Sequence, residues 1–281
     1  MKLDTGWVTF ASAGEDFPAY FARPPGATPG MPALVIIHEA FGVDAYIEDV
    51  ASRFAAAGYE TLAPDLLSPG GARPTELTRP RLEAASAFLN ANPAAWSNAI
   101  AREAALAGLP DDQRLSIAAT LGKLFTPDEA RAARLARYTE VLVAAVGHLR
   151  SGTAGGELGR QAARKIGAVG FCMGGALSGL LAAAEPGLDA AVVFYGTVPP
   201  AEKIAAIRCP MQGHYADPDP RITPHVAAFA EALQAQGVPF DAHVYPGARH
   251  AFFNDTAGSY GLDASRAAYA RTLSFLLRHL A

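Results

Sequence analysis

"IGAVGFCMGGALSGLLAAA", residues 166–184, contains a strand pattern that is followed directly by a helix pattern. Its apolar first part, residues 166–171, has the composition of a strand that is buried on both faces of a sheet. Residues 175–184 are rich in Ala and Leu, as is typical of a helix. Cys172 lies between the two parts and between glycines, so the backbone must turn sharply there. The stretch therefore predicts a strand, a tight turn and a helix, with a thiol at the turn.

The same alternation of strand and helix patterns extends along most of the chain. Residues 44–57 have helical spacing with apolar side chains on one face, and Gly58 ends this predicted helix. Further helices are predicted at 224–237 and 265–280, and further strands at 6–12, 17–24, 32–38, 59–66, 190–196, 209–216 and 240–247. Strands that alternate with helices form parallel sheets. We therefore expect an α/β protein with a mostly parallel central sheet flanked by helices.

The alternation stops between residues 68 and 150. Residues 68–80 are rich in Gly and Pro, as in a loop, and residues 81–150 are alanine-rich and mostly helical in pattern, with breaks at prolines. No strand pattern appears before about residue 166, which leaves too long a segment for one crossover helix. We therefore expect residues 1–281 to form a single domain in which 68–150 is a helical insertion that caps the sheet.

The composition argues against several classes of partner. The 281 residues have a formal net charge of −4 and no cluster of Lys and Arg, so we expect no nucleic-acid partner and no acidic-lipid partner. No apolar run reaches the roughly 18 residues of a membrane span, and the chain start lacks the apolar core of a secretory signal. Two cysteines cannot form a disulfide framework. We therefore expect a cytoplasmic protein with reduced thiols, and the sequence leaves open whether it is a monomer or a homodimer.

Reactive side chains occur where four of the predicted strands end. In chain order they are His38, Glu39, Cys172, Asp217, Asp219 and His250. Because functional groups of such sheets collect at the carboxyl ends of the strands, these side chains are expected at one edge. A thiol, an imidazole and a carboxylate can act together as a nucleophile, its base and a group that orients the base. This order therefore favours nucleophilic catalysis.

The turn at Cys172 has the pattern of a nucleophile elbow, with Cys in place of Ser. In Gly170-x-Cys172-x-Gly174 the side chain sits on a tight strand-to-helix turn, where the helix N-terminus stabilises a thiolate. The backbone N–H groups of Met173 and Ala40 are the candidate donors to an oxyanion. The alternative is that Cys172 is a small apolar residue that packs between glycines.

Four stretches of the chain form a combination that is specific as a whole, although each alone is weak. They are "VIIHEAFGVDAYIEDVASRFAAAGYETLAPDL" (35–66), "VGFCMGG" (169–175), "GHYADPDPRITP" (213–224) and "YPGARHAFFN" (245–254). Together they resemble the dienelactone hydrolase family, of the carboxymethylenebutenolidase type, over nearly the whole chain outside 68–150. The resemblance implies an α/β-hydrolase fold, no cofactor, and hydrolysis of a small-molecule ester or lactone substrate.

The resemblance also assigns roles to individual residues. It implies a Cys–His–Asp triad with Cys172 as nucleophile, His250 as base and Asp219 as acid. Glu39 matches the carboxylate that stands near the thiol in this family and takes part in forming the thiolate. Asp217 is the competing aspartate, but the pattern Asp-x-x-Ile-Thr-Pro begins at Asp219 and favours that residue.

The segment after His250 is expected to shape the substrate pocket. Phe252, Phe253 and Asn254 predict a neutral, largely apolar wall, whereas dienelactone-cleaving members of the family hold a substrate carboxylate with arginines. We therefore expect small neutral esters to be hydrolysed at least as well as carboxylate-bearing dienelactones. Arginines of the predicted insertion that could instead reach a carboxylate are Arg73, Arg79 and Arg131.

Two other functions remain open from the residues alone. The same site could serve a thioesterase, or the chain could be a non-catalytic ligand-binding module of the same fold with Cys172 as a redox-sensitive thiol. The complete set of nucleophile, base, acid and elbow glycines argues against the second. No His, Cys or acid spacing predicts a metal site, and no Gly-rich phosphate loop is present in the sequence.

Overall fold

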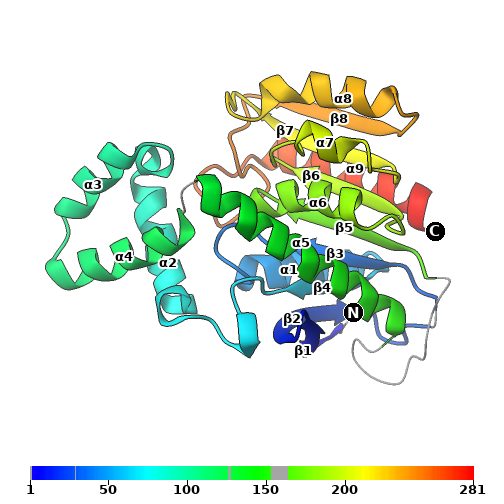
Figure 1. The fold of residues 1–281 in the computed structure, drawn as a ribbon, viewed down its shortest axis with the longest axis horizontal. Coiled ribbons are helices and arrows are strands. Elements are labelled where there is room, and N and C mark those ends of the chain that lie inside the picture. The colour runs from blue at the N-terminus through cyan, green and yellow to red at the C-terminus, as the bar shows by residue number, and fades with distance from the viewer. Residues whose placement is uncertain (1, 29, 126–127, 153–163) are drawn as a thin grey trace.

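A mostly parallel sheet forms the centre of the computed structural model, which describes residues 2–28, 30–125, 128–152 and 164–281. Its strands are β1 (Asp4–Ser12), β2 (Glu15–Arg23), β3 (Ala33–Ile37), β4 (Glu60–Pro64), β5 (Ile166–Phe171), β6 (Ala190–Phe194), β7 (Met211–Asp217) and β8 (Phe240–Pro246). Over the described residues they lie in the order β1-β2-β4-β3-β5-β6-β7-β8 (Figure 1). The pairs from β4 to β8 are parallel, and the hairpin of β1 and β2 joins β4 antiparallel. The predicted fold class is confirmed.

Burial explains why the central strands have unbroken apolar sequences. Every residue of β3, β5 and β6 is buried, because helices cover both faces of the sheet there. The edge strands β1 and β8 instead have exposed positions along their length. The buried strands β3 and β5 therefore precede Glu39 and Cys172, whereas His250 follows the edge strand β8.

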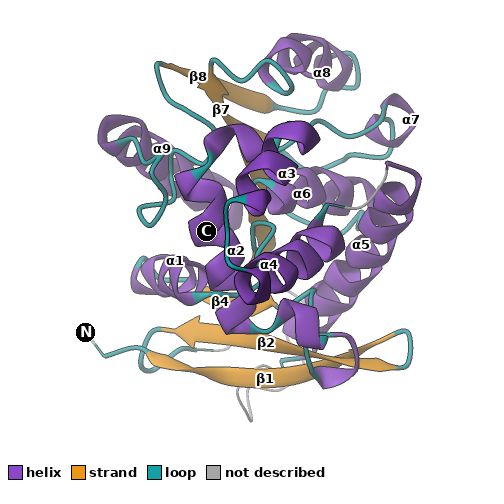
Figure 2. Ribbon diagram, turned by 90° about the vertical axis from the view of Figure 1, so that its left-hand side faces the viewer, coloured by secondary structure: helices purple, strands orange, loops and turns teal. Residues whose placement is uncertain are grey.

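Helices cover both faces of the sheet (Figure 2). Over the described residues they are α1 (Ala45–Ala56), α2 (Arg79–Ala91), α3 (Ala99–Ala107), α4 (Asp111–Leu124), α5 (Asp128–Ser151), α6 (Met173–Ala184), α7 (Ala201–Ile204), α8 (Val226–Gln234) and α9 (Leu262–Leu280). Apolar side chains of α1 and α9 share one buried cluster with the sheet, and those of α5, α6 and α8 share the cluster on the other face. Among the described helices, none combines the length and the apolar character needed to cross a bilayer.

Helices α2, α3 and α4 stand apart from the sheet (Figure 1). Their apolar side chains, including Phe88 and Leu121, form a small core of their own. Helix α5 also lies within the range 68–150, but its Leu142 and Leu149 belong to the main core beside the sheet. The part of 68–150 that stands off the sheet therefore ends before α5, which occupies the place of the crossover helix between β4 and β5.

Candidate active site

The turn at Cys172 joins β5 to α6 in a conformation that few residues with side chains adopt. Its φ is 54°, in the left-handed region, and its N–H donates to the carbonyl of Phe194 at 3.0 Å. A Cβ on Gly170 would lie 1.9 Å from the carbonyl oxygen of Gly174, and a Cβ on Gly174 would lie 2.2 Å from that of Ile37. The two glycines therefore let the first turn of α6 approach β5 and the end of β3. The Cys172 side chain remains partly exposed.

The imidazole of His250 joins the thiol of Cys172 to a carboxylate. His250 Nε2 lies 3.2 Å from Cys172 Sγ, and Nδ1 lies 2.8 Å from Oδ2 of Asp219. Asp219 is 5% exposed and also accepts the backbone N–H of Arg221 at 3.3 Å. Of the two candidate aspartates, Asp219 is the one in contact with His250, whereas Asp217 is exposed at the end of β7. The structure thus brings three of the predicted side chains into one line.

The charges along this line favour a protonated imidazole. Burial alone would lower the pKa of His250, but a thiolate at Cys172 and the hydrogen bond to Asp219 raise this pKa to about 10. Burial opposes ionisation of Asp219 as well, but the hydrogen bond with His250 and the positive imidazole hold the pKa of this carboxyl below its usual value. The hydrogen bond to the Asp219 carboxylate therefore favours the protonated form of His250.

Glu39 lies close enough to His250 for the two charges to interact. Its Oε2 accepts a hydrogen bond from Nδ2 of Asn254 at 2.8 Å, and its Oε1 is buried. Burial raises the pKa of Glu39, while the Asn254 amide and the positive charge of His250 lower it. The sequence placed Asn254 in a substrate wall, whereas in the structure it holds Glu39 and is 8% exposed.

Phe252 and Phe253 have a different position from the one expected. They are 0% and 3% exposed, so both side chains belong to the core. Phe252 packs on Tyr195 and Tyr245, and Phe253 stacks near Phe171. The two phenylalanines therefore pack in the core against the loop that contains His250, and they do not form an open pocket wall.

Tyr195 is a site residue that the sequence analysis missed. Its ring lies 5.2 Å from that of His250, its side chain is fully buried, and its φ is 40°. The charge of Glu39 is among the causes that, after burial, raise the pKa of Tyr195, so the two side chains are close. The signal that could have revealed Tyr195 is its place directly after the buried strand β6 and before Gly196, where α6 approaches closely.

Met173 and Ala40 lie at the ends of neighbouring strands. Met173 is the first residue of α6, and the N–H groups of a first helical turn have no acceptor within the helix. Ala40 lies two residues beyond His38, whose carbonyl oxygen would be 2.6 Å from a Cβ on Gly174. The two candidate oxyanion donors therefore belong to the first turn of α6 and to the loop after β3, which lie at the ends of neighbouring strands.

The insertion arginines proposed as carboxylate ligands have other partners or lie outside this cluster. Arg73 forms an ion pair with Asp65 at 2.6 Å, and Arg79 pairs with Glu48 at 3.2 Å. Arg131 is exposed on α5. None of these contacts involves Cys172, His250 or Asp219.

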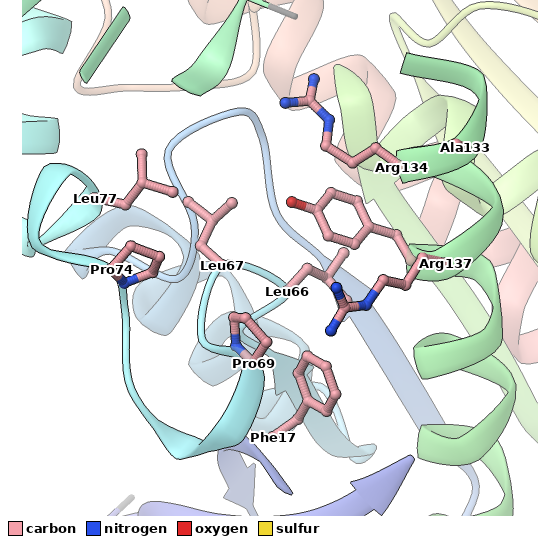
Figure 3. Close-up of a pocket in the computed structure, with 10 residues that line it drawn as sticks. Phe17, Leu66, Leu67, Pro69, Pro74, Leu77, Ala133, Arg134 and Arg137 are labelled. Atoms are coloured by element: carbon pink, nitrogen blue, oxygen red, sulfur yellow. The ribbon is translucent and has the colours of Figure 1, made fainter. Parts of the chain in front are cut away.

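A cavity of about 390 Å³ lies between the segment after β4 and helix α5 (Figure 3). Arg134 and Arg137 on α5 face an apolar wall that contains Leu66 and Leu67. Tyr138 also lines the cavity. None of the predicted site residues lines this cavity. Over the part of the chain that the structure describes, no group of three His, Cys, Asp or Glu side chains is placed to hold a metal ion.

Comparisons with known proteins identify the family of this chain. The model of the "Dienelactone hydrolase family" matches residues 17–280. A protein of Saccharolobus solfataricus named "Putative carboxymethylenebutenolidase" is 31% identical over 257 residues, which cover 90% of this chain and 92% of that protein. A protein of Bradyrhizobium sp named "Probable 2-oxo-3-(5-oxofuran-2-ylidene)propanoate lactonase" is 29% identical over 286 residues, 98% of this chain and 94% of that protein.

The fold is shared over its full length with solved structures. The crystal structure of a "Putative Dienelactone Hydrolase" from Klebsiella pneumoniae has a TM-score of 0.64 and 25% sequence identity, and the match covers 98% of each chain. The resemblance drawn from the four sequence stretches is thereby confirmed. Because the family model spans nearly all of the sequence, the chain belongs to the dienelactone hydrolase family.

Proposed function

We propose that the protein hydrolyses small esters or lactones through an acyl-enzyme formed on Cys172. The observation that carries this proposal is the line of contacts from Cys172 Sγ through His250 to Asp219, at 3.2 and 2.8 Å. Membership of the dienelactone hydrolase family supports hydrolytic chemistry at this line. The strained turn at Cys172 supports a catalytic role for this residue rather than a role in packing alone, because strained backbone conformations are found preferentially at active sites.

In the proposed mechanism Cys172 attacks as a thiolate paired with the imidazolium of His250. The sulfur forms a bond to the substrate carbonyl carbon, and the carbonyl electron pair moves onto oxygen. This oxyanion accepts hydrogen bonds from the N–H groups of Met173 and Ala40. The bond to the leaving oxygen then breaks as His250 Nε2 gives that oxygen its proton, which leaves a thioester. Neutral His250 next takes a proton from water, which attacks the thioester and releases the acid and the thiolate.

The two carboxylates have separate roles in this proposal. Asp219 accepts a hydrogen bond from Nδ1–H of His250 and so keeps the imidazole oriented toward the thiol. Glu39 takes part in forming the thiolate: because burial raises its pKa, it accepts the thiol proton more readily than an exposed carboxylate does, and it passes this proton to His250, which holds it as the imidazolium. Asn254 holds Glu39 beside the site with a neutral amide.

For the substrate we propose small esters and lactones, with neutral ones cleaved at least as well as those that carry a carboxylate. The name of the Bradyrhizobium relative supports a lactone. Asn254 supports a neutral substrate because it occupies the stretch after His250 where the family resemblance leads us to look for arginine. We further propose a reducing compartment, the cytoplasm, as the working place, since both cysteines are free and Cys172 must remain a thiol.

Hydrolysis of p-nitrophenyl acetate by the purified chain tests the proposal. Cys172→Ala and His250→Ala should each lower kcat by about 1,000-fold or more, because nucleophile and base act as a unit. Cys209→Ala is the matched control, because Cys209 is 5% exposed in the core and burial raises its pKa to about 12. This control should keep the wild-type rate.

Three results would contradict the proposal or redirect it. A chain that binds the ester but does not turn it over would favour the non-catalytic module. Loss of activity in Cys209→Ala with activity retained in Cys172→Ala would overturn the choice of nucleophile. A matched thiol ester that is cleaved far faster than its oxygen ester would indicate a thioesterase.

A further inference from the structure

Three polar side chains with little exposure contact the loop that joins β3 to α1: His38, Asp65 and Arg73. His38 is 0% and Asp65 is 3% exposed, and the Arg73 side chain is 12% exposed. We infer that this cluster, called the loop clamp below, is a positioning device that fixes the backbone N–H of Ala40 toward the thiol. The inference rests on the proposed function, in which this N–H group stabilises the oxyanion.

His38 is in a defined protonation state because of its two partners. Its Nε2 lies 3.1 Å from the backbone N of Leu66, and its Nδ1 lies 2.5 Å from the carbonyl oxygen of Glu39. An amide N–H can only donate, so Nε2 must be the acceptor and the proton must reside on Nδ1. Nδ1 therefore donates to the Glu39 carbonyl. Burial lowers the pKa of His38, which agrees with a neutral ring.

This hydrogen bond determines the direction of the next N–H group. The carbonyl of Glu39 and the N–H of Ala40 belong to one peptide unit. In a planar trans peptide the two groups point in opposite directions. A carbonyl that is held toward His38 therefore turns the Ala40 N–H away from it.

The order of the strands identifies what this N–H group faces. Leu66 follows β4, and β4 lies beside β3 on the side opposite to β5 (Figure 1). The imidazole of His38 thus lies on the β4 side, and the Ala40 N–H points toward the β5 side. Cys172 follows β5, and a Cβ on Gly174 would touch the carbonyl oxygens of Ile37 and His38. The N–H group is therefore aimed at the end of β5, where the thiol lies.

The ion pair of the clamp holds the other end of the same loop. Arg73 Nε donates to Asp65 Oδ2 at 2.6 Å, and Arg73 Nη2 donates to the carbonyl of Val43 at 2.8 Å. Asp65 Oδ1 accepts the N–H of Val43 in a longer contact of 3.5 Å. A Cβ on Gly42 would lie 2.6 Å from Arg73 Nη2, so the glycine allows the guanidinium to reach the loop. The loop is therefore fixed on both sides of Ala40.

The clamp could also serve only to stabilise the fold, and this role can be distinguished from positioning of the Ala40 N–H. Buried ion pairs are often no more stabilising than apolar side chains of similar volume, so stability alone is a weak reason for this one. An oxyanion donor, in contrast, must be held in place before the reaction, and removal of one such donor typically lowers kcat by about 100- to 1,000-fold. The two roles can be separated by a reaction that needs the thiolate but forms no oxyanion.

Alkylation of Cys172 by iodoacetamide is such a reaction. In His38→Leu, which removes both hydrogen bonds, kcat for p-nitrophenyl acetate should fall by about 10- to 100-fold with KM nearly unchanged. The rate of Cys172 alkylation should stay within about twofold of the wild type. His38→Gln, whose amide can both donate and accept, should recover most of kcat. His250→Ala should instead slow both reactions.

The outcomes separate this inference from the proposed function. If the wild type does not hydrolyse the ester, the proposed function fails and the inference fails with it. If the wild type is active and His38→Leu keeps the wild-type kcat, or loses alkylation and hydrolysis to the same extent, the inference alone is overturned. If His38→Leu does not fold, Arg73→Lys can replace it in the comparison of ester hydrolysis with Cys172 alkylation. This variant retains the charge beside Asp65 but loses the hydrogen-bond donor to the Val43 carbonyl. Its kcat should fall while alkylation is unchanged, and an equal loss of both would again overturn the inference.

Discussion

The backbone of Cys172, whose thiol projects from the end of the sheet, has a strained conformation. A side chain at φ 54° typically costs about 1–3 kcal/mol, so the surrounding contacts must hold it. They do so through the N–H of Cys172, which donates to Phe194, and through Gly170 and Gly174, which let α6 pack against β5 and β3. A cysteine used for packing alone has no need of this conformation. At the scale of one residue, the turn therefore supports a reactive thiol.

Asp219 and Asp217 are a matched pair for testing what orients His250. Asp219→Asn replaces a carboxylate that accepts from Nδ1 with an amide that can also donate, so the preferred tautomer of the imidazole changes. We expect kcat for an aryl ester to fall by roughly 100-fold or more. Asp217→Asn changes an exposed side chain and should leave kcat within about twofold. If Asp217→Asn were the more damaging variant, the choice of Asp219 would be wrong.

Aromatic side chains next to helices α2, α3 and α4 contact the loop after β3. The ring of Phe41, in the loop after β3, lies edge-on to Trp96 at 5.7 Å, and Trp96 lies 6.1 Å from Phe125. Arg102 lies 4.4 Å above the ring of Phe125. The loop that carries Ala40 is therefore in contact both with the segment between α2 and α3 and with the loop clamp.

A deletion tests whether this helical unit selects the substrate. Removal of residues 79–124, with a short Gly/Ser linker in their place, leaves α5 on the sheet and takes away the small separate core. We expect the ratio of kcat/KM for a long-chain to a short-chain p-nitrophenyl ester to change by about tenfold, because the contacts that recognise the acyl chain are lost. Trp96→Ala should change this ratio in the same direction by a smaller factor. A folded deletion variant with the wild-type ratio would contradict a selecting role.

Across the whole molecule, the pattern of burial determines which parts of the fold and of the candidate site could be predicted from the sequence. Strand 166–171 is covered on both faces, so its apolar run was recognisable, and the position of Cys172 in the turn after it followed from this run. His250 follows the partly exposed edge strand β8, and its place was recognised from the turn after that strand. Their catalytic roles stay predictions. The burial of Phe252 was not predictable, because only the packing of β6 and α9 against its loop decides whether the ring faces solvent or core. Helical spacing likewise did not show that α5 packs on the sheet while α2 to α4 do not.

The charges around the whole site bear on the choice of substrate. Glu39 and Asp219 place two carboxyl groups beside the imidazole, and the chain has a formal net charge of −4. Arg73 and Arg79, from the segment before α2 and its first turn, are already paired with carboxylates. A substrate carboxylate that is buried without a cation loses its hydration without compensation. The site should therefore not favour an anionic acyl group.

Two esters of matched length test this expectation: p-nitrophenyl butyrate, which is neutral, and p-nitrophenyl hemisuccinate, which ends in a carboxylate. We expect kcat/KM for the butyrate to equal or exceed that for the hemisuccinate, because the hemisuccinate carboxylate would lose its hydration without a cation to compensate. A clear preference for the hemisuccinate would contradict the prediction. It would also require a cation at the site, and Arg131→Gln and Arg221→Gln would then show whether the arginine on α5 or the one beside Asp219 supplies it.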